Sequence, residues 1–268
     1  MLKKSHTHGL ILLIGLAFLY TPILVLIINS FNQSRLVSYW GGWSFQWYKT
    51  LIHDQDVLSA AWLTLRLAFS ASSIAIVLAT LLAVILKRYK HFSGKTFIYA
   101  MSISPIILPD VVSGLALLLL FVSLERLIHW PSTEGFDTIL IAHITFCTAY
   151  ASIIIQSRFA SLDKSLEEAA LDLGASPTKT FFWITLPQLF PSLLAAWLLG
   201  FTLSIDDVVI TTFVSGPSNT TLPMYIFSTV KTGTTPELNA LATVMILIIA
   251  GLLIMGSCFK KNIKIRKI

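Results

Sequence analysis

Carboxylates inside strongly apolar segments are the residues of this sequence whose chemistry stands out. Asp110 follows the run ISPIILP, and Asp206 and Asp207 are adjacent in FTLSIDDVVITTF. Each charge would cost about 2.5–3.5 kcal/mol at the centre of a bilayer, so such groups face a polar cavity, a partner subunit or a cation rather than lipid. Arg66 is the one base in these segments. Because acids outnumber bases there, we predict that the three aspartates line a path for a cationic substrate.

Each of these acids also has a structural alternative. Asp110 could cap the second half of a helix that Pro105 and Pro109 kink or break. One of Asp206 and Asp207 could hydrogen-bond the backbone or pair with the base of the spans. Adjacent residues do not share one helix face, so the sequence leaves open which of the two faces the path.

The elements that must position these acids are transmembrane helices. The chain is 55% hydrophobic and 12% charged, whereas soluble domains carry about 25% charged residues. A helix needs about 20 apolar residues to cross the hydrocarbon core. We therefore predict an all-α polytopic membrane protein whose six transmembrane helices lie at 10–29, 58–86, 96–124, 138–157, 188–213 and 238–259.

The basic residues predict the orientation of these spans. Of the 19 Lys and Arg residues, 14 lie in the termini and loops of one side, four lie in loops of the other side, and Arg66 lies within a span. Cytoplasmic loops carry the excess of basic residues, so both termini are predicted to be cytoplasmic. This bias accounts for the net charge of +6 without nucleic acid, and it suits anionic lipid headgroups.

The longest predicted cytoplasmic loop, 158–187, has a helical pattern. Ser165 and Glu168 have the spacing of a capping box at a helix start. Leucines and alanines follow at helical spacing and form one apolar stripe. Gly174 can adopt the left-handed conformation that ends a helix. The pattern predicts a short amphipathic helix outside the membrane.

A second short helix is predicted directly after this one. Ser176 is a suitable N-cap, and Pro177 would occupy the first helical position. Pro187 is expected to end this helix. The loop would then be a compact helix–glycine–helix unit whose small residues allow a partner to pack closely against it.

The spacing in this loop resembles a known signature. EAA at 168–170, Gly174 and ITLP at 184–187 follow the pattern E-A-A-x3-G-x9-I-x-L-P of permease subunits of binding-protein-dependent ABC importers. The resemblance implies the type I importer permease fold and a loop helix that fits a groove of an ATPase subunit. The chain lacks a GxxxxGK[ST] motif, so the ATPase is expected on another polypeptide and this chain is not expected to be an enzyme. The implied ATPase-coupling residues are Glu168, Ala169, Ala170 and Gly174.

Further segments resemble the permeases of polyamine importers. They are 108–121, 142–150, 201–223 and 236–244, and the insert 128–138 is more similar to the putrescine-type than to the spermidine-type permease. The resemblance implies inward transport of putrescine or a related polyamine across the bacterial inner membrane. It also implies a heterodimer with a sister permease, two copies of an ATP-binding subunit and a periplasmic polyamine-binding protein.

Three parts of the chain are predicted. Residues 1–57 form the first span and an aromatic-rich periplasmic loop, which suits membrane anchoring or contact with an external partner. Residues 58–259 form the permease core, and residues 260–268 form a basic cytoplasmic tail. We predict no cofactor and no metal site.

Other functions remain as alternatives. The same machinery could carry spermidine or another organic cation. An ion-coupled secondary transporter would use Asp110 or Asp206 as a proton relay. An intramembrane enzyme would use His143, but no GxSxG or HExxH motif supports it; His143 is instead expected to pack or to hydrogen-bond between helices.

Overall fold

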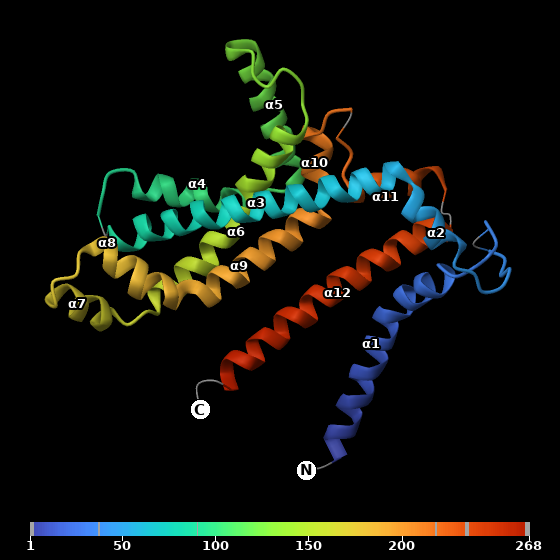
Figure 1. The fold of residues 1–268 in the computed structure, drawn as a ribbon, viewed down its shortest axis with the longest axis horizontal. Helices are drawn as coiled ribbons and strands as arrows, with labels where there is room; N and C mark the ends of the chain where they lie inside the picture. Colours follow the sequence, from blue (N-terminus) through green and yellow to red (C-terminus); the bar gives the residue numbers. More distant parts are fainter. Residues whose placement is uncertain (1–2, 37, 90, 218, 234–235, 266–268) are drawn as a thin grey trace. The chain divides into compact units, whose positions relative to one another are not determined.

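A computed structural model describes residues 3–36, 38–89, 91–217, 219–233 and 236–265 (Figure 1). These residues form helices joined by loops, and an isolated bridge between Asn32 and Trp43 is their one β-type pairing. The prediction of an all-α protein is confirmed. The helices are α1 (Lys3–Asn29), α2 (Gln46–His53), α3 (Gln55–Arg88), α4 (Lys95–Ile107), α5 (Asp110–Ile128), α6 (Phe136–Ala160), α7 (Lys164–Asp172), α8 (Pro177–Thr180), the π-helix η1 (Phe181–Thr185), α9 (Leu186–Asp206), α10 (Val209–Val214), α11 (Leu222–Thr232) and α12 (Pro236–Ile265).

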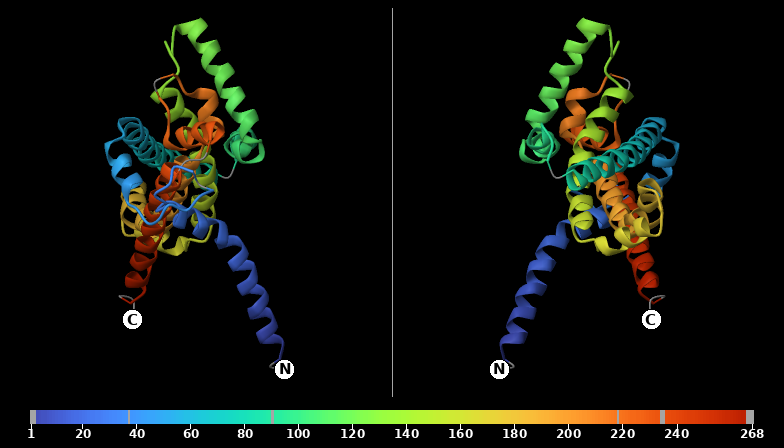
Figure 2. Two further views of the ribbon diagram at one scale, coloured as in Figure 1. Left: turned by 90° about the vertical axis from the view of Figure 1, so that its right-hand side faces the viewer. Right: turned by 90° about the vertical axis from the view of Figure 1, so that its left-hand side faces the viewer.

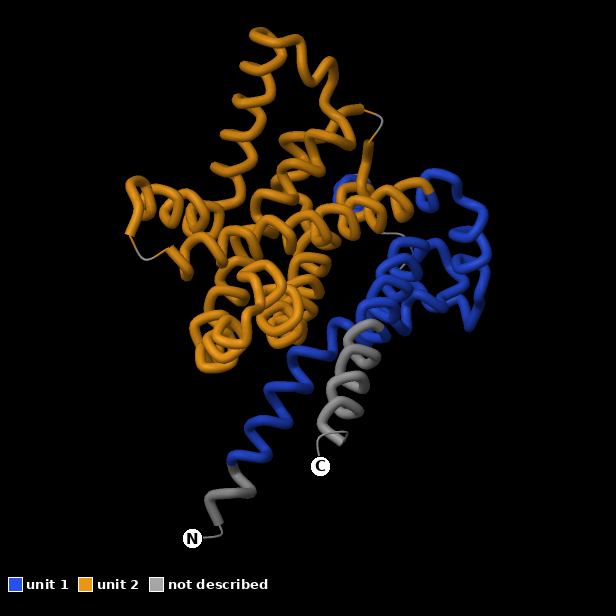
Figure 3. The backbone as a smooth tube through the Cα atoms, turned by 60° about the vertical axis from the view of Figure 1, so that its left-hand side comes forward, with its two compact units in different colours: residues 1–58, 226–268 blue, residues 59–225 orange. Residues whose placement is uncertain are grey.

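The helices form two compact units (Figure 3). Unit 1 comprises residues 1–58 and 226–268, and unit 2 comprises residues 59–225. The side chains of the predicted basic tail, 260–268, lie outside the described part of the chain, as does the backbone of 266–268.

Five helical segments of the described residues are long and apolar enough to cross a membrane. They correspond to predicted spans one to five, and the sixth predicted span corresponds to α12, whose segment Pro236–Gly251 is a shorter apolar helix. The ranges of the five are His8–Asn29, Gln55–Arg88, Asp110–Ile128, Phe136–Ala160 and Pro177–Asp206.

Two predicted spans are interrupted. The predicted span 96–124 is divided into α4 and α5, because Pro109 lacks an N–H donor and holds Leu108 in an extended conformation (ψ 140°). The predicted span 188–213 ends early at Asp206. Asp207 is also extended (φ −67°, ψ 127°), and the short helix α10 follows it. Backbone groups freed at such breaks are tolerated at membrane depth where they line a cavity or are buried in protein.

The core of unit 2 is built around α6, which packs against α4 and α9 (Figures 1 and 2). Small residues let these helices approach closely. A Cβ atom at Gly200 of α9 would lie 3.6 Å from Cys147 of α6 and from Ser72 of α3. Helix α5 packs instead on α10, where Gly114 leaves room for the ring of Phe213.

In unit 1, α12 packs against α1 and α2. The loop before α2 is ordered by Asn32, whose side chain accepts hydrogen bonds from the backbone N–H groups of Ser34 and Gly41. The indole of Trp47 donates to the Asn32 carbonyl at 2.7 Å. The rings of Tyr39 and Trp43 remain largely exposed on this loop, which suits either of the two roles predicted for it.

Candidate functional site

The three predicted path residues, Asp110, Asp206 and Asp207, line a single cavity of about 430 Å³ in unit 2. All three lie at the breaks in the two interrupted spans: Asp110 is the first residue of α5, Asp206 is the last residue of α9, and Asp207 follows it in the link to α10. The cavity therefore combines three carboxylates with two aromatic rings. Its further lining residues are Pro105, Phe146, Tyr150, Leu203, Val208, Val209 and Ile210.

Asp207 is held by the protein itself. Its carboxylate accepts hydrogen bonds from the backbone N–H of Thr211 at 2.8 Å and from the Thr211 hydroxyl at 2.6 Å. The backbone N–H of Ile210 is 3.4 Å away. Asp207 thus satisfies orphan donors at the start of α10, so the predicted alternative of backbone bonding is confirmed for this residue.

Asp206 has a different environment. Its side chain is exposed and lines the cavity, and none of the ion pairs found among the described residues involves it. Among the described residues, no aspartate forms an ion pair with Arg66. The guanidinium carbon of Arg66 instead lies 4.6 Å from the ring centroid of Phe136. Asp206 is consequently the member of the pair that is open to a ligand.

Asp110 is the first residue of α5 and is also exposed. The start of a helix carries a partial positive charge that stabilises a carboxylate there. The N-cap of α5 is Pro109, whose side chain makes no capping hydrogen bond. The position of Asp110 at a helix start fits the alternative in which it stabilises that start. Its place in the cavity lining fits its predicted role in the substrate path.

A buried histidine lies behind the cavity. His143 is fully buried on α6, with Nδ1 2.7 Å from the Ser204 hydroxyl of α9 and Nε2 2.9 Å from the Thr211 hydroxyl of α10. Nε2 is also 3.5 Å from the Asp207 carboxylate. The expectation that His143 hydrogen-bonds between helices is confirmed, and the structure adds that it braces the break beside the aspartate pair.

The helix–glycine–helix unit predicted in the cytoplasmic loop is present as α7, Gly174 and α8. Gly174 has a φ of +84°, as predicted for the residue that ends the first helix. Glu168 and Ala169 are exposed and Ala170 is half-buried. Leu166, Leu171 and Leu173 are exposed, Leu173 to 90%, so the unit presents apolar side chains that the described part of the chain leaves uncovered.

The predicted cap of α7 is wrong. The N-cap is Asp163, whose carboxylate accepts a hydrogen bond from the backbone N–H of Ser165 at 2.9 Å. This bond lowers the pKa of Asp163. Aspartate is as good an N-cap as serine, and the helix begins before Ser165, at Lys164.

The predicted start of α8 is confirmed and its predicted end is wrong. Ser176 is the N-cap and accepts from the backbone N–H of Lys179 at 3.4 Å, with Pro177 in the first turn. The helix does not end at Pro187 but continues from α8 through η1 into α9. The wider hydrogen-bond pattern of a π-turn directly before Pro187 accommodates a residue without an N–H donor.

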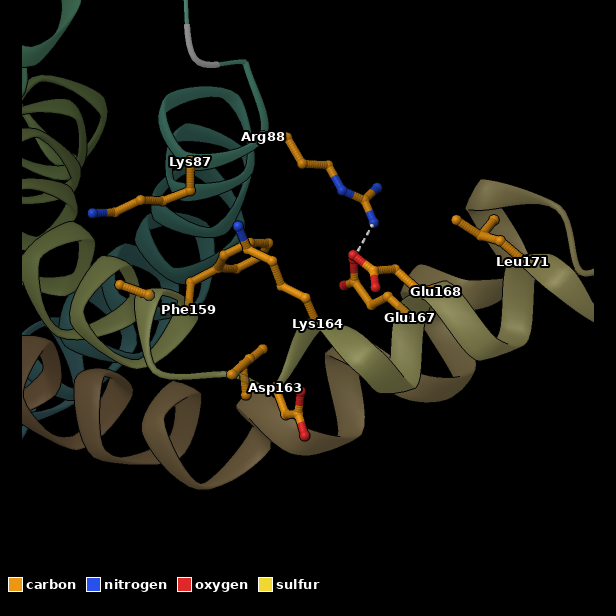
Figure 4. A pocket seen from close by; sticks show the side chains of 10 residues that line it. Lys87, Arg88, Phe159, Asp163, Lys164, Glu167, Glu168 and Leu171 are labelled. Carbon is orange, nitrogen blue, oxygen red and sulfur yellow. Dashed lines mark hydrogen bonds and ion pairs between the residues drawn. The ribbon is translucent and has the colours of Figure 1, made fainter.

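Sequence analysis did not single out Glu167, which anchors α7. Its carboxylate lies 3.2 Å from the Arg88 guanidinium at the end of α3 (Figure 4). It also accepts a hydrogen bond from the Thr185 hydroxyl of η1. A cleft of about 400 Å³ adjoins this ion pair. The only signal in the sequence was a second glutamate before the EAA triplet. The cleft is lined by Lys87, Arg88, Phe159, Ala160, Leu162, Asp163, Lys164, Glu167, Glu168 and Leu171.

Comparison with known proteins places this geometry in a family. Residues 75–267 match the family model described as "Binding-protein-dependent transport system inner membrane component". The putrescine transport system permease protein PotI of Escherichia coli K12 is 52% identical over 243 residues, which cover 91% of this chain and 86% of the relative. The spermidine/putrescine transport system permease protein PotC of Haemophilus influenzae is 41% identical, covering 92% and 93%.

Solved structures show the same fold. A chain of a bacterial ABC transporter involved in the import of the acidic polysaccharide alginate superposes with a TM-score of 0.76, covering 97% of this chain and 95% of that chain at 15% identity. A chain of the MetNI methionine ABC transporter superposes with a TM-score of 0.62, covering 82% and 98%. The predicted importer permease fold is confirmed.

Both curated relatives are named permeases, so the expectation of a transport component rather than an enzyme is confirmed. The family match covers α6, the α7–α8 unit, α9 and α10, which carry most of the features described above. This chain belongs to the family of inner membrane components of binding-protein-dependent transport systems.

Proposed function

We propose that this chain is a membrane-spanning permease subunit of an ATP-driven importer that carries putrescine or a closely related polyamine into the cytoplasm. The observation that carries the proposal is the cavity that joins Asp110, Asp206 and Asp207. It is supported by 52% identity to a putrescine transport permease. A diamine with two protonated amines needs several carboxylates along its path, and a neutral or acidic substrate would not.

Within this cavity, we assign the direct contacts with ammonium groups to Asp206 and Asp110, because both are exposed. Asp207 contributes negative charge, but its oxygens are engaged by Thr211. The rings of Phe146 and Tyr150 line the same cavity and would add cation–π attraction. The methylene chain of the diamine would lie against the apolar side chains between them.

The proposed energy source is a separate ATPase dimer. Glu168, Ala169, Ala170 and Gly174 are the proposed coupling residues: Glu168 supplies a charged contact, the alanines permit close approach, and Gly174 sets the turn. The proposed orientation has both termini and this unit on the cytoplasmic side. A sister permease completes the membrane part, and a periplasmic binding protein delivers the polyamine to the outer loops.

Uptake of radiolabelled putrescine and spermidine by a strain that lacks this gene tests the proposal. Restoring the gene is expected to restore putrescine uptake, and excess unlabelled putrescine is expected to compete. Spermidine is the second candidate substrate, because a relative with 41% identity is named for both amines. Uptake of neither amine would contradict the proposal.

A further inference from the structure

One side chain of α7 links this helix to others of unit 2 by polar contacts, in addition to the packing of α7 against α8 and η1. Among the described residues of α7, Glu167 alone makes polar side-chain contacts with other helices. One carboxylate oxygen accepts from the Thr185 hydroxyl, and the other lies 3.2 Å from Arg88. The carboxylate therefore joins three elements, α7, the end of α3 and the turn η1 that leads into α9.

This contact is partly shielded from solvent. The Glu167 side chain is 24% exposed and that of Arg88 is 32% exposed, whereas Thr185 is fully buried. A buried hydroxyl has few partners with which to replace the carboxylate, so its loss leaves an unsatisfied group. The neighbouring residue Glu168 is exposed at the same cleft and remains available to a partner.

A lever transmits a displacement only if it is fixed to the parts it must move. Helices α3 and α9 are two of the long apolar segments of this chain, and both are reached from α7 through Glu167. Glu168, by contrast, lies on the surface that is open to the ATPase. Glu168 is thus available for a contact with the ATPase, and Glu167 attaches α7 to the other helices of unit 2.

We propose that Glu167 is a positioning residue that couples the movement of α7 to α3 and α9 through Arg88 and Thr185. The proposal rests on the proposed function, in which a separate ATPase moves α7. Removal of Glu167 then uncouples the importer: the ATPase still binds and hydrolyses ATP, but less substrate crosses per ATP.

The test uses the full complex with its sister permease, ATPase and binding protein in proteoliposomes. Glu167→Ala is expected to lower uptake per ATP by about fivefold or more, the lower end of typical coupling effects, with the ATPase subunit still copurifying. Glu167→Gln keeps an acceptor for Thr185 and is expected to recover part of this loss. Thr185→Val should give an uptake per ATP closer to that of Glu167→Gln than to that of the wild type. The losses caused by Thr185→Val and Glu167→Gln should not be additive in the double variant.

Asp172→Asn is the matched control, because Asp172 is an exposed carboxylate on the same helix. It is expected to change uptake per ATP by less than about twofold, as for other surface substitutions. Unchanged coupling in Glu167→Ala would overturn the proposal. Loss of the ATPase subunit from that variant would also overturn it, because Glu167 would then belong to the contact with the ATPase.

A second measurement does not depend on the substrate. Spin labels at Asp172→Cys on α7 and Phe190→Cys on α9 report whether these helices move as one body when ATP binds. A single, unchanged distance is expected with Glu167, and a broadened or shifted distance is expected in the Glu167→Ala background. Equal distances in both backgrounds would overturn the proposal, whereas a failure of the proposed substrate would appear only as absent amine uptake by the wild-type complex.

Discussion

At the scale of single residues, neighbouring acids of one type have different environments. Asp207 is bound by Thr211 and lies beside His143, while Asp206 is open to the cavity. The sequence predicted that these acids and Asp110 would face a cavity, and they line one. The sequence could not predict which of Asp206 and Asp207 is exposed to the cavity. Their different exposure depends on a helix break between the two residues, which no proline or glycine marks.

Asp206→Asn is expected to raise the KM for putrescine by about tenfold or more. A hydrogen bond to a charged group contributes about 1.5–3 kcal/mol, and each 1.4 kcal/mol corresponds to a factor of ten. Concentration-dependent uptake at matched membrane levels checks this. The control is Thr202→Val, four residues earlier on α9, where the hydroxyl bonds only the backbone of its own helix. A KM equal to that of the wild type would contradict the assignment of Asp206.

His143→Ala is expected to destabilise the protein. It removes the partner of the buried Ser204 hydroxyl and one of the partners of the Thr211 hydroxyl, which keeps its bond to Asp207; an unsatisfied buried group costs about 1–3 kcal/mol. A loss of this size lowers the Tm by several degrees, since about 1 kcal/mol corresponds to 2–4 °C in domains of 150–250 residues. Thermal unfolding in detergent measures this shift. His143→Gln, which keeps donor and acceptor groups, should lose less, and an unaltered Tm in His143→Ala would contradict the bracing role.

At the scale of elements, two prolines show what the sequence could and could not predict. Pro109 ends a helix, as predicted, whereas the helix continues through Pro187 because a π-turn precedes it. Helices α7 and α8 both pack against this π-turn, and such tertiary contacts are not written in local residue preferences. The α7–α8 unit itself was predictable, since Gly174, Ser176 and Pro177 are strong local signals.

The cap of α7 predicts a pH dependence. The hydrogen bond from Ser165 lowers the pKa of Asp163 in the folded protein, so ionised Asp163 stabilises α7. This contribution is complete above the pKa of the unfolded chain, about 3.9, and is lost as the pH falls through the lower pKa of the folded state.

Amide hydrogen exchange of α7 therefore should be slower, after correction for intrinsic rates, at pH 5 than at the acid end of its stability range. Asp163→Asn keeps a capping oxygen and should remove this dependence while α7 still forms. An equal pH dependence in Asp163→Asn and wild type would show that another group controls the start of the helix.

Gly174→Ala is expected to strain the link between α7 and α8. A Cβ at Gly174 would meet no atom within 4 Å, so the cost comes from its positive φ alone. The left-handed conformation costs non-glycine residues about 1–2 kcal/mol. Uptake should fall in Gly174→Ala and recover in Gly174→Asn, because asparagine tolerates this conformation better. Equal uptake by the alanine variant and the wild type would exclude a need for this turn.

At the scale of the whole molecule, large apolar surfaces of the described helices remain exposed. The apolar window of α1 has no buried residue, and that of α5 is 11% buried. Such helices need lipid or a second subunit around them. Hydropathy was therefore sufficient to predict the membrane class, and the EAA spacing was sufficient to predict the importer fold that solved structures share at 15% identity.

We propose that a separate ATPase subunit supplies the energy for transport through this chain. The most direct test is uphill putrescine uptake into proteoliposomes that hold the complete complex and enclosed ATP. Accumulation is expected to require ATP and to stop when the ATPase subunit is inactivated, while ionophores that collapse proton and sodium gradients leave it unchanged. Accumulation that persists with an inactive ATPase, or that ionophores abolish while ATP is present, would contradict the account.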